Sequence, residues 1–208
     1  MITTVKSLDD IRKEVLDFDS LPSHEEVVYY LNNGPQEELQ SFSFNPVYQI
    51  LNKEFISELS KYLKYIESNC HTDKPIIEVC AGNGKLSHHL RNQGINILAT
   101  DDYSWDNISR KENKVEKLKC SKALEKYNPE IVIASWLPPR STLNMNIVNH
   151  PSVKYFISIG DQDWGEACGS GEIYDKAKYR TIEEITRYST GKSDTSDIQF
   201  STVEVFEK

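Results

Sequence analysis

The chain has 208 residues, 38% of them hydrophobic, which is enough to bury the core of one domain with a small extension. Its 32 acidic and 24 basic residues give a net charge of −8, which argues against tight binding to nucleic-acid phosphates or anionic membranes. The absence of a long apolar run, a polar N-terminus and four scattered cysteines predict a cytoplasmic protein with no membrane span, zinc site or disulfide framework.

The first 73 residues are expected to form an N-terminal helical cap. Ser7 with Asp10, and Ser23 with Glu26, have the spacing of capping boxes at two helix starts. Gly34-Pro35 ends the second helix, and Asn45-Pro46 is a suitable start for a third. Apolar residues recur at helical spacing along that third helix, at Val47, Leu51, Phe55, Leu59, Leu63 and Ile66.

From Lys74 onwards, short apolar runs alternate with helical segments. The predicted strands are Ile76–Cys80, Ile95–Thr100, Lys114–Leu118, Glu130–Ser135, Val153–Ile159 and Ser201–Phe206. The predicted helices are Lys85–Asn92, Ser121–Tyr127 and Gly171–Arg187, and residues 189–197 are expected to form a polar loop. This alternation predicts an α/β fold in residues 74–208, with a doubly wound, mostly parallel Rossmann-like sheet.

The stretch "PIIEVCAGNGKLSHHL" joins a predicted strand to a predicted helix through Gly82 and Gly84. Glycine allows a sharp reversal and lets a ligand approach the backbone. Ligands of doubly wound sheets lie beyond the carboxyl ends of the strands, where this turn falls. The next strand leads to Asp101, whose carboxylate can accept hydrogen bonds from both hydroxyls of a ribose. The pattern predicts a nucleoside site and fits both NAD and S-adenosylmethionine.

Two further features favour S-adenosylmethionine over a dinucleotide. The register Gly82-x-Gly84-x-x-Ser87 lacks the third glycine of the dinucleotide fingerprint. Glu78, inside the first predicted strand at the end of its apolar run, would repel a pyrophosphate, whereas it suits a ligand with an ammonium and a sulfonium.

The segments "EVCAGNG" and "ATDD" resemble the first two motifs of class I S-adenosylmethionine-dependent methyltransferases, and the resemblance extends from about Lys74 to the C-terminus. Cys80 takes the place of the first glycine of the motif. The resemblance implies methyl transfer and a site for S-adenosylmethionine. In that site Glu78 would act near the methionine, and the methionine and ribose would be lined by Ala81, Gly82, Asn83 and Gly84. Asp101 would hold the ribose, Asp102 or Tyr103 would flank the adenine, and Cys120 would lie at the edge of the adenine.

The segment "IVIASWLPPRS" follows the fourth predicted strand and resembles the (Asp/Asn/Ser)-Pro-Pro-aromatic motif of methyltransferases that act on amino groups. Ser135 is separated from Pro138-Pro139 by two residues, and Arg140 stands in place of the aromatic residue. Trp136 either supplies an aromatic wall or is a buried residue of a rigid loop. A Trp and prolines at this place, with "CGSG" further on, also resemble a bacterial and fungal subset of class I methyltransferase-like proteins.

The candidate catalytic residues are Ser135, Trp136 and Asp161, and the acceptor is expected to be a small or medium-sized molecule, with an amine favoured. Asp161 belongs to an acidic segment that is either part of the acceptor site or a solvated loop. His88 and His89 lack further ligands that would make a metal site.

Two alternatives remain open. The chain could bind S-adenosylmethionine without catalysing a transfer, because its Pro-Pro motif departs from the pattern. It could also be an NAD-dependent oxidoreductase. Tyr174 and Lys178 have the Tyr-x-x-x-Lys spacing of some of these enzymes, but they lie too late in the chain.

Overall fold

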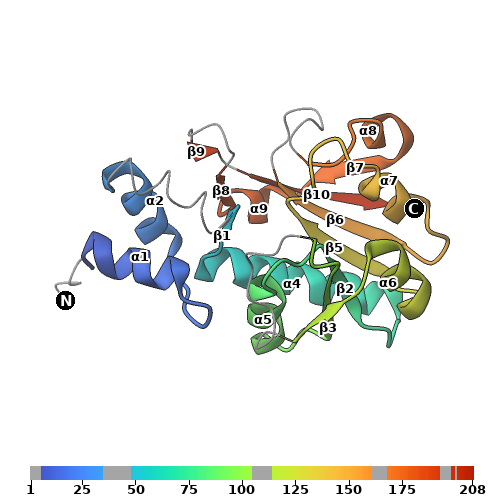
Figure 1. The fold of residues 1–208 in the computed structure, drawn as a ribbon, viewed down its shortest axis with the longest axis horizontal. Helices are drawn as coiled ribbons and strands as arrows, with labels where there is room; N and C mark the ends of the chain where they lie inside the picture. Colours follow the sequence, from blue (N-terminus) through green and yellow to red (C-terminus); the bar gives the residue numbers. More distant parts are fainter. Residues whose placement is uncertain (1–5, 35–47, 105–113, 161–167, 193–197, 200) are drawn as a thin grey trace.

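The computed structural model describes residues 6–34, 48–104, 114–160, 168–192, 198–199 and 201–208. Its centre is a seven-stranded sheet in the order β4-β3-β2-β5-β6-β10-β7 (Figure 1). In chain order these strands are β2 (Ile76–Val79), β3 (Ile97–Asp101), β4 (Val115–Lys117), β5 (Ile131–Ser135), β6 (Tyr155–Gly160), β7 (Lys178–Thr181) and β10 (Thr202–Glu207). The first five pair in parallel, and β10 is antiparallel to both β6 and β7.

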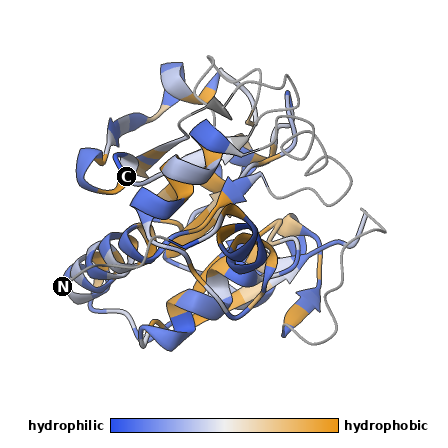
Figure 2. Cartoon of the chain, turned by 90° about the vertical axis from the view of Figure 1, so that its left-hand side faces the viewer, coloured by the Kyte–Doolittle hydropathy of each residue, from blue (hydrophilic) through white to orange (hydrophobic). Residues whose placement is uncertain are grey.

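Helices cover both faces of this sheet, as expected for a doubly wound α/β fold. One face carries α4 (Lys53–Cys70), α5 (Lys85–Asn92) and α9 (Glu183–Thr186). The other carries α6 (Cys120–Tyr127), α7 (Leu143–Asn149) and α8 (Ile173–Lys176). Figure 2 shows hydrophobic colour concentrated on the strands between the helices. The six strands predicted from apolar runs are confirmed to within two residues at each end.

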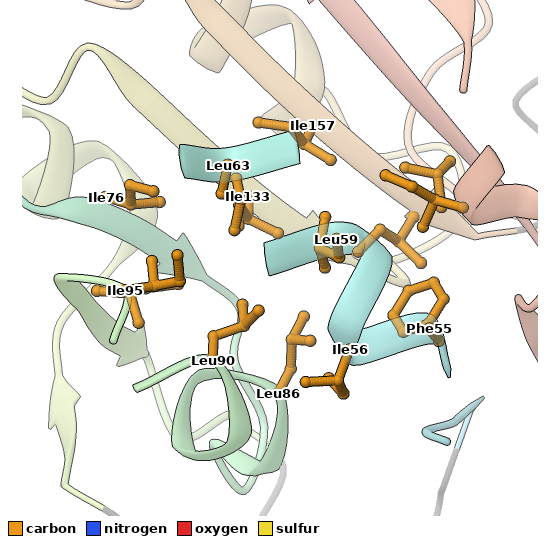
Figure 3. Close-up of a cluster of buried hydrophobic side chains, with 14 of the residues drawn as sticks. Phe55, Ile56, Leu59, Leu63, Ile76, Leu86, Leu90, Ile95, Ile133 and Ile157 are labelled. Atoms are coloured by element: carbon orange, nitrogen blue, oxygen red, sulfur yellow. The ribbon is translucent and has the colours of Figure 1, made fainter. Parts of the chain in front are cut away.

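The core between the sheet and α4 explains why α4 forms as a helix. Its apolar stripe meets the sheet and α5, as the sticks in Figure 3 show for Phe55, Leu59, Leu63, Leu86 and Leu90. Asn52 caps its N-terminus by accepting a hydrogen bond from the Phe55 N–H at 2.8 Å. The helix therefore lies on the main sheet, with its stripe fully buried.

The N-terminal helices form a smaller cluster beside the sheet. These are α1 (Leu8–Leu16) and α2 (His24–Asn33), which pack together with Ile50 of the short strand β1 (Gln49–Ile50). The predicted caps are confirmed, because Ser7 caps α1 and a reciprocal capping box joins Ser23 and Glu26. Strand β1 pairs with β8 (Thr190–Lys192), which pairs with β9 (Ile198–Gln199), to make a second small sheet.

Three expectations about secondary structure are wrong. The helix that carries the apolar stripe begins at Lys53, because residues 49–50 extend to pair with β8, and its predicted start at Asn45-Pro46 lies outside the described residues. The predicted helix Gly171–Arg187 is interrupted by β7, where pairing with β10 outweighs local helix propensity. The start of the predicted loop, 190–192, is strand β8, and residues 193–197 lie outside the described part of the chain.

Candidate cofactor and acceptor site

The strand register brings two of the predicted site residues, Asp101 and Ser135, to either side of Cys80. Val79, the last residue of β2, is opposite Thr100 of β3 and Ala134 of β5. The next position along each strand therefore places Cys80 between Asp101 and Ser135. Because parallel strands lie about 5 Å apart, these residues form a row at the carboxyl edge of the sheet.

The turn after β2 contains three residues in the left-handed region, Cys80 (φ 54°), Gly82 (φ 56°) and Gly84 (φ 77°). The Ala81 N–H donates to Thr100 O at 3.0 Å, and the Gly84 N–H closes the turn on Ala81 O at 2.9 Å. Glycine adopts this region freely, whereas an L-residue such as cysteine loses roughly 1–2 kcal/mol there. Cys80 thus adopts a backbone conformation that favours glycine, at a cost in free energy.

Glu78 lies beneath this turn and holds the start of α5. Its carboxylate accepts hydrogen bonds from the Ser87 N–H at 3.1 Å and from the Ser87 hydroxyl. The N-cap residue Gly84 has no side chain to cap the helix, so Glu78 supplies the acceptor from the strand. Glu78 is 2% exposed, and burial raises the pKa of its carboxyl to about 7 against the opposing effect of the Ser87 bonds.

Asp101, at the tip of β3, faces the same turn. One carboxylate oxygen accepts a hydrogen bond from the Gly82 N–H at 2.9 Å, and the other accepts one from the Tyr103 N–H at 2.8 Å. Tyr103 is left-handed (φ 62°), and its hydroxyl donates to Val115 O at 2.6 Å. The exposed Asp102 accepts a hydrogen bond from the Ser104 N–H at 2.9 Å. Asp101 is therefore the acid of this pair that contacts the glycine turn.

The half-buried thiol of Cys80 belongs to this row, and the buried thiol of Cys120 lies near it. Burial raises the pKa of Cys80 to about 12 and that of Cys120, the first residue of α6, to about 11. Thiols with such pKa values stay protonated at neutral pH and are poor nucleophiles. Cys120 is 7% exposed, so it presents little surface to a ligand as the protein stands.

Strand β5 ends in a buried hydroxyl that has no partner among the described residues. Ser135 Oγ is buried and forms no hydrogen bond with any residue that the structure describes. Trp136 follows in the left-handed region (φ 55°), and its backbone N–H donates to Ile159 O at 2.8 Å. Arg140 is left-handed as well (φ 57°). Two strained residues in so short a segment are typical of functional sites, where the rest of the structure holds them in place.

The indole of Trp136 is packed against the small sheet. Its N–H donates to Gln49 Oε1 at 3.0 Å, and its ring stacks on Tyr48 at 5.7 Å between centroids. Gly191 of β8 lies so close that a Cβ atom there would come within 2.2 Å of the ring. Asp161, the other predicted catalytic candidate, lies outside the described residues.

The N-terminal helices are tied to α5 immediately after the glycine turn. Lys85, 9% exposed, donates to the carbonyl oxygens of Val15 at 3.0 Å and Asp17 at 2.5 Å, and so caps the C-terminus of α1. Burial lowers the pKa of its ammonium to about 8. His88 also faces this segment, with Nε2 3.1 Å from Asp19. His89 is buried, and its pKa is lowered to about 4, chiefly by burial.

The roles of Lys85, Ser87 and Gln49 were missed from the sequence. A lysine or serine early in a helix is usually solvated, so Lys85 and Ser87 carry no signal of their own. Gln49 contacts a residue 87 positions away. Within the described residues, no group of three His, Cys, Asp or Glu side chains could hold a metal ion, and no helix is long and apolar enough to cross a membrane.

Fold and turn together define the class of structure. A parallel sheet with one antiparallel strand inserted before its last member, and a glycine turn after the inner strand β2, is the fold of class I Rossmann-like methyltransferases.

No protein-family model matches the sequence, and no curated protein matches it either. Among solved structures, magnesium protoporphyrin IX methyltransferase (ChlM) from Synechocystis PCC 6803, with bound S-adenosylmethionine (SAM), is similar at 13% identity and a TM-score of 0.49, over 91% of this chain and 99% of ChlM. The bifunctional kinase-methyltransferase WbdD is similar at 13% identity and a TM-score of 0.45, over 75% of this chain but only 39% of WbdD. The 23S rRNA methyltransferase ErmE is similar at 10% identity and a TM-score of 0.39, over 71% of this chain and 67% of ErmE. Similarities at this level assign neither a substrate nor a residue role.

Proposed function

We propose that this chain binds S-adenosylmethionine between the turn after β2 and the tip of β3, and catalyses methyl transfer to a small or medium-sized acceptor. An amine is the favoured acceptor. The net charge of −8 supports a small molecule over a nucleic acid, whose phosphates would be repelled.

The contact between Asp101 and Gly82 carries this proposal. A half-buried carboxylate that faces a left-handed glycine turn offers two acceptor oxygens beside backbone that a ligand can approach. A ribose diol needs two such acceptors, and the nucleoside of S-adenosylmethionine carries one. The two acceptor oxygens therefore fit an adenosine whose ribose hydroxyls donate to Asp101.

The remaining residues of the turn and of β3 extend the proposed site. Ala81, Gly82, Asn83 and Gly84 would line the methionine and ribose. Asp102 or Tyr103 would flank the adenine, with Cys120 at its edge. Glu78 would favour the cationic end of the ligand from beneath the turn, because its carboxylate lies under the turn, where it bonds to Ser87 in the first turn of α5.

Bound S-adenosylmethionine supplies an activated methyl group, so the protein needs only to align the acceptor, exclude water and receive a proton. Ser135 is suited to alignment. Its buried hydroxyl lacks a partner within the described residues, and it lies next to Cys80 in the strand register. An amine N–H donating to this oxygen would satisfy it and hold the nitrogen at the edge of the sheet.

A non-catalytic S-adenosylmethionine-binding protein is the second candidate. The observation that favours it is the packing of Trp136, whose ring is engaged by Tyr48 and Gly191. An NAD-dependent oxidoreductase is disfavoured. Ser87 replaces the third glycine and bonds Glu78, while Tyr174 lies in α8 and Lys178 in β7.

Titration calorimetry separates binding of S-adenosylmethionine from binding of NAD. S-adenosylhomocysteine is expected to bind with one site per chain, and NAD is expected to give no heat of binding. Binding of NAD without S-adenosylhomocysteine would overturn the proposal. Mass spectrometry of small molecules that co-purify with the protein, and of extracts incubated with S-adenosylmethionine, would then separate an enzyme from a binding protein.

A further inference from the structure

Trp136 is held in a strained conformation by groups from distant parts of the chain. Its backbone is left-handed, and its indole N–H lies in a half-buried position where it donates to Gln49 Oε1 at 3.0 Å. Gln49 comes from β1, near the N-terminal helices, whereas Gly191, which leaves room for the ring, comes from β8. The conformation of the segment after β5 thus depends on the small sheet.

The Gln49 amide is fixed by a closed ring of hydrogen bonds. An indole N–H can only donate, so the oxygen of the amide must face Trp136. The same oxygen accepts from the Ser201 hydroxyl at 2.8 Å, and the amide nitrogen donates to Ser189 Oγ at 3.1 Å. Ser189 and Ser201 are fully buried, with their hydroxyl oxygens 2.6 Å apart.

Every polar atom of this ring has a consistent role. Ser201 donates its one hydroxyl hydrogen to Gln49, so Ser189 must donate to Ser201. Ser189 in turn accepts from the Gln49 amide, which closes the ring. A fully satisfied ring of this kind is rigid, because rotating one member leaves the others unpaired. Gln49 therefore presents a carbonyl oxygen to Trp136 in a fixed place.

Trp136 is covalently next to Ser135, whose buried hydroxyl forms no bond with any described residue. If the indole lost its acceptor, a half-buried donor would be left unpaired in a segment that is already strained, and relaxing the segment would move Ser135. Holding the indole therefore fixes where the Ser135 hydroxyl points.

We propose that Gln49 is a positioning residue, which acts through Trp136 to place the Ser135 hydroxyl on the acceptor side of the site. This inference rests on the proposed function, since it assumes that S-adenosylmethionine binds across the turn after β2. It adds a role for the small sheet, which would couple the N-terminal segment to recognition of the acceptor.

Sinefungin tests this inference without knowledge of the acceptor. It carries an amine-bearing carbon where S-adenosylmethionine has its methyl-bearing sulfonium, so its amine would take the place of the transferred methyl group and face the acceptor side of the site. S-adenosylhomocysteine lacks that amine. The ratio of their dissociation constants in calorimetry therefore reports the groups that surround the methyl position, and a change in this ratio between variants reports the change made there.

We expect the wild-type chain to prefer sinefungin, and Gln49→Met to reduce that preference by about five-fold, the value of one ordinary hydrogen bond. Its affinity for S-adenosylhomocysteine should stay within about two-fold. Ser135→Ala should lose the preference equally, and the double variant should lose no more, because both changes remove the same contact. The matched control Gln93→Met changes an exposed glutamine and should alter neither constant.

Gln49→Glu keeps an acceptor for the indole but cannot donate to Ser189, so it should retain more of the preference than Gln49→Met does. It also covers the case in which Gln49→Met does not fold. An unchanged ratio in Gln49→Met, additive losses in the double variant, or equal binding of the two ligands by the wild type would overturn the inference while leaving the proposed function intact. If the wild type binds neither ligand, the proposed function itself fails, and the inference fails with it.

Discussion

The carboxylate of Asp101 accepts a hydrogen bond from the backbone N–H of Gly82 at 2.9 Å. This contact joins the tip of β3 to the turn after β2, two segments that the parallel register already places side by side. Within the proposed site, the same carboxylate would bind the ribose, so the turn and the ribose would share one acceptor group. Four predictions follow from this arrangement and the groups around it.

Glu78 should make stability depend on pH. Burial raises the pKa of its carboxyl from 4.5 to about 7 in the folded protein. Between these values the folded protein holds a proton that the unfolded chain has released, so the free energy of unfolding falls as pH rises from about 4.5 to about 7. The fall from this residue is at most about 3 kcal/mol. Urea unfolding across this range should show a steeper fall in the wild type than in Glu78→Gln, and the difference in slope reports Glu78.

Ser87→Ala is the matched variant for this measurement. It removes the hydroxyl that favours the charged form of Glu78, so the pKa of Glu78 should rise further. The slope should then extend to higher pH. Parallel curves for the wild type and Glu78→Gln would show that Glu78 does not titrate as described.

Cys80 should lower the stability of the folded protein relative to a glycine at the same position. At a φ of 54°, an L-residue is strained, and glycine removes that strain at the expense of a more flexible unfolded chain. Cys80→Ala loses the sulfur but keeps the strain. We expect Cys80→Gly to exceed Cys80→Ala by about 1 kcal/mol in the free energy of unfolding, measured in urea. A higher free energy of unfolding for Cys80→Ala than for Cys80→Gly would argue against a strained turn.

Lys85 should control docking of the N-terminal helices. Lys85→Met leaves the carbonyls of Val15 and Asp17 without their donor, which should cost about 1–3 kcal/mol in local stability. Hydrogen exchange of amides in α1 should then accelerate while that of β2 and β5 stays unchanged. Lys61→Met, at an exposed site on α4, is the control and should leave α1 protected. Equal acceleration in both variants would mean that Lys85 does not hold α1.

The strands of the parallel sheet could be predicted because burial on both faces leaves a short continuous apolar run. In β2 all four residues, including Glu78, are buried, and the run ends where the glycine turn begins. Asp101 could be placed for the same reason, since the parallel register brings consecutive strand tips together. Local patterns of this kind survive in the sequence because each depends on one element and its immediate neighbours.

The missed elements depend on distant partners. Three of the four residues in β7 are exposed, so the strand shows no alternation and exists because β10 pairs with it. The bond from Trp136 to Gln49 spans 87 positions and involves a common polar residue in a two-residue strand. Lys85 bonds backbone carbonyls, which leave no trace in side-chain patterns. Such contacts become visible only when the chain is folded.

The most direct test of the central claim is calorimetric titration of S-adenosylhomocysteine into the wild type and Asp101→Ala, with Asp73→Ala as the control at an exposed acid before β2. If Asp101 grips the ribose, its loss should weaken binding by about 2–3 kcal/mol, roughly 30- to 150-fold, while Asp73→Ala binds as the wild type does. Equal affinity in all three proteins, or no binding by the wild type, would contradict the account.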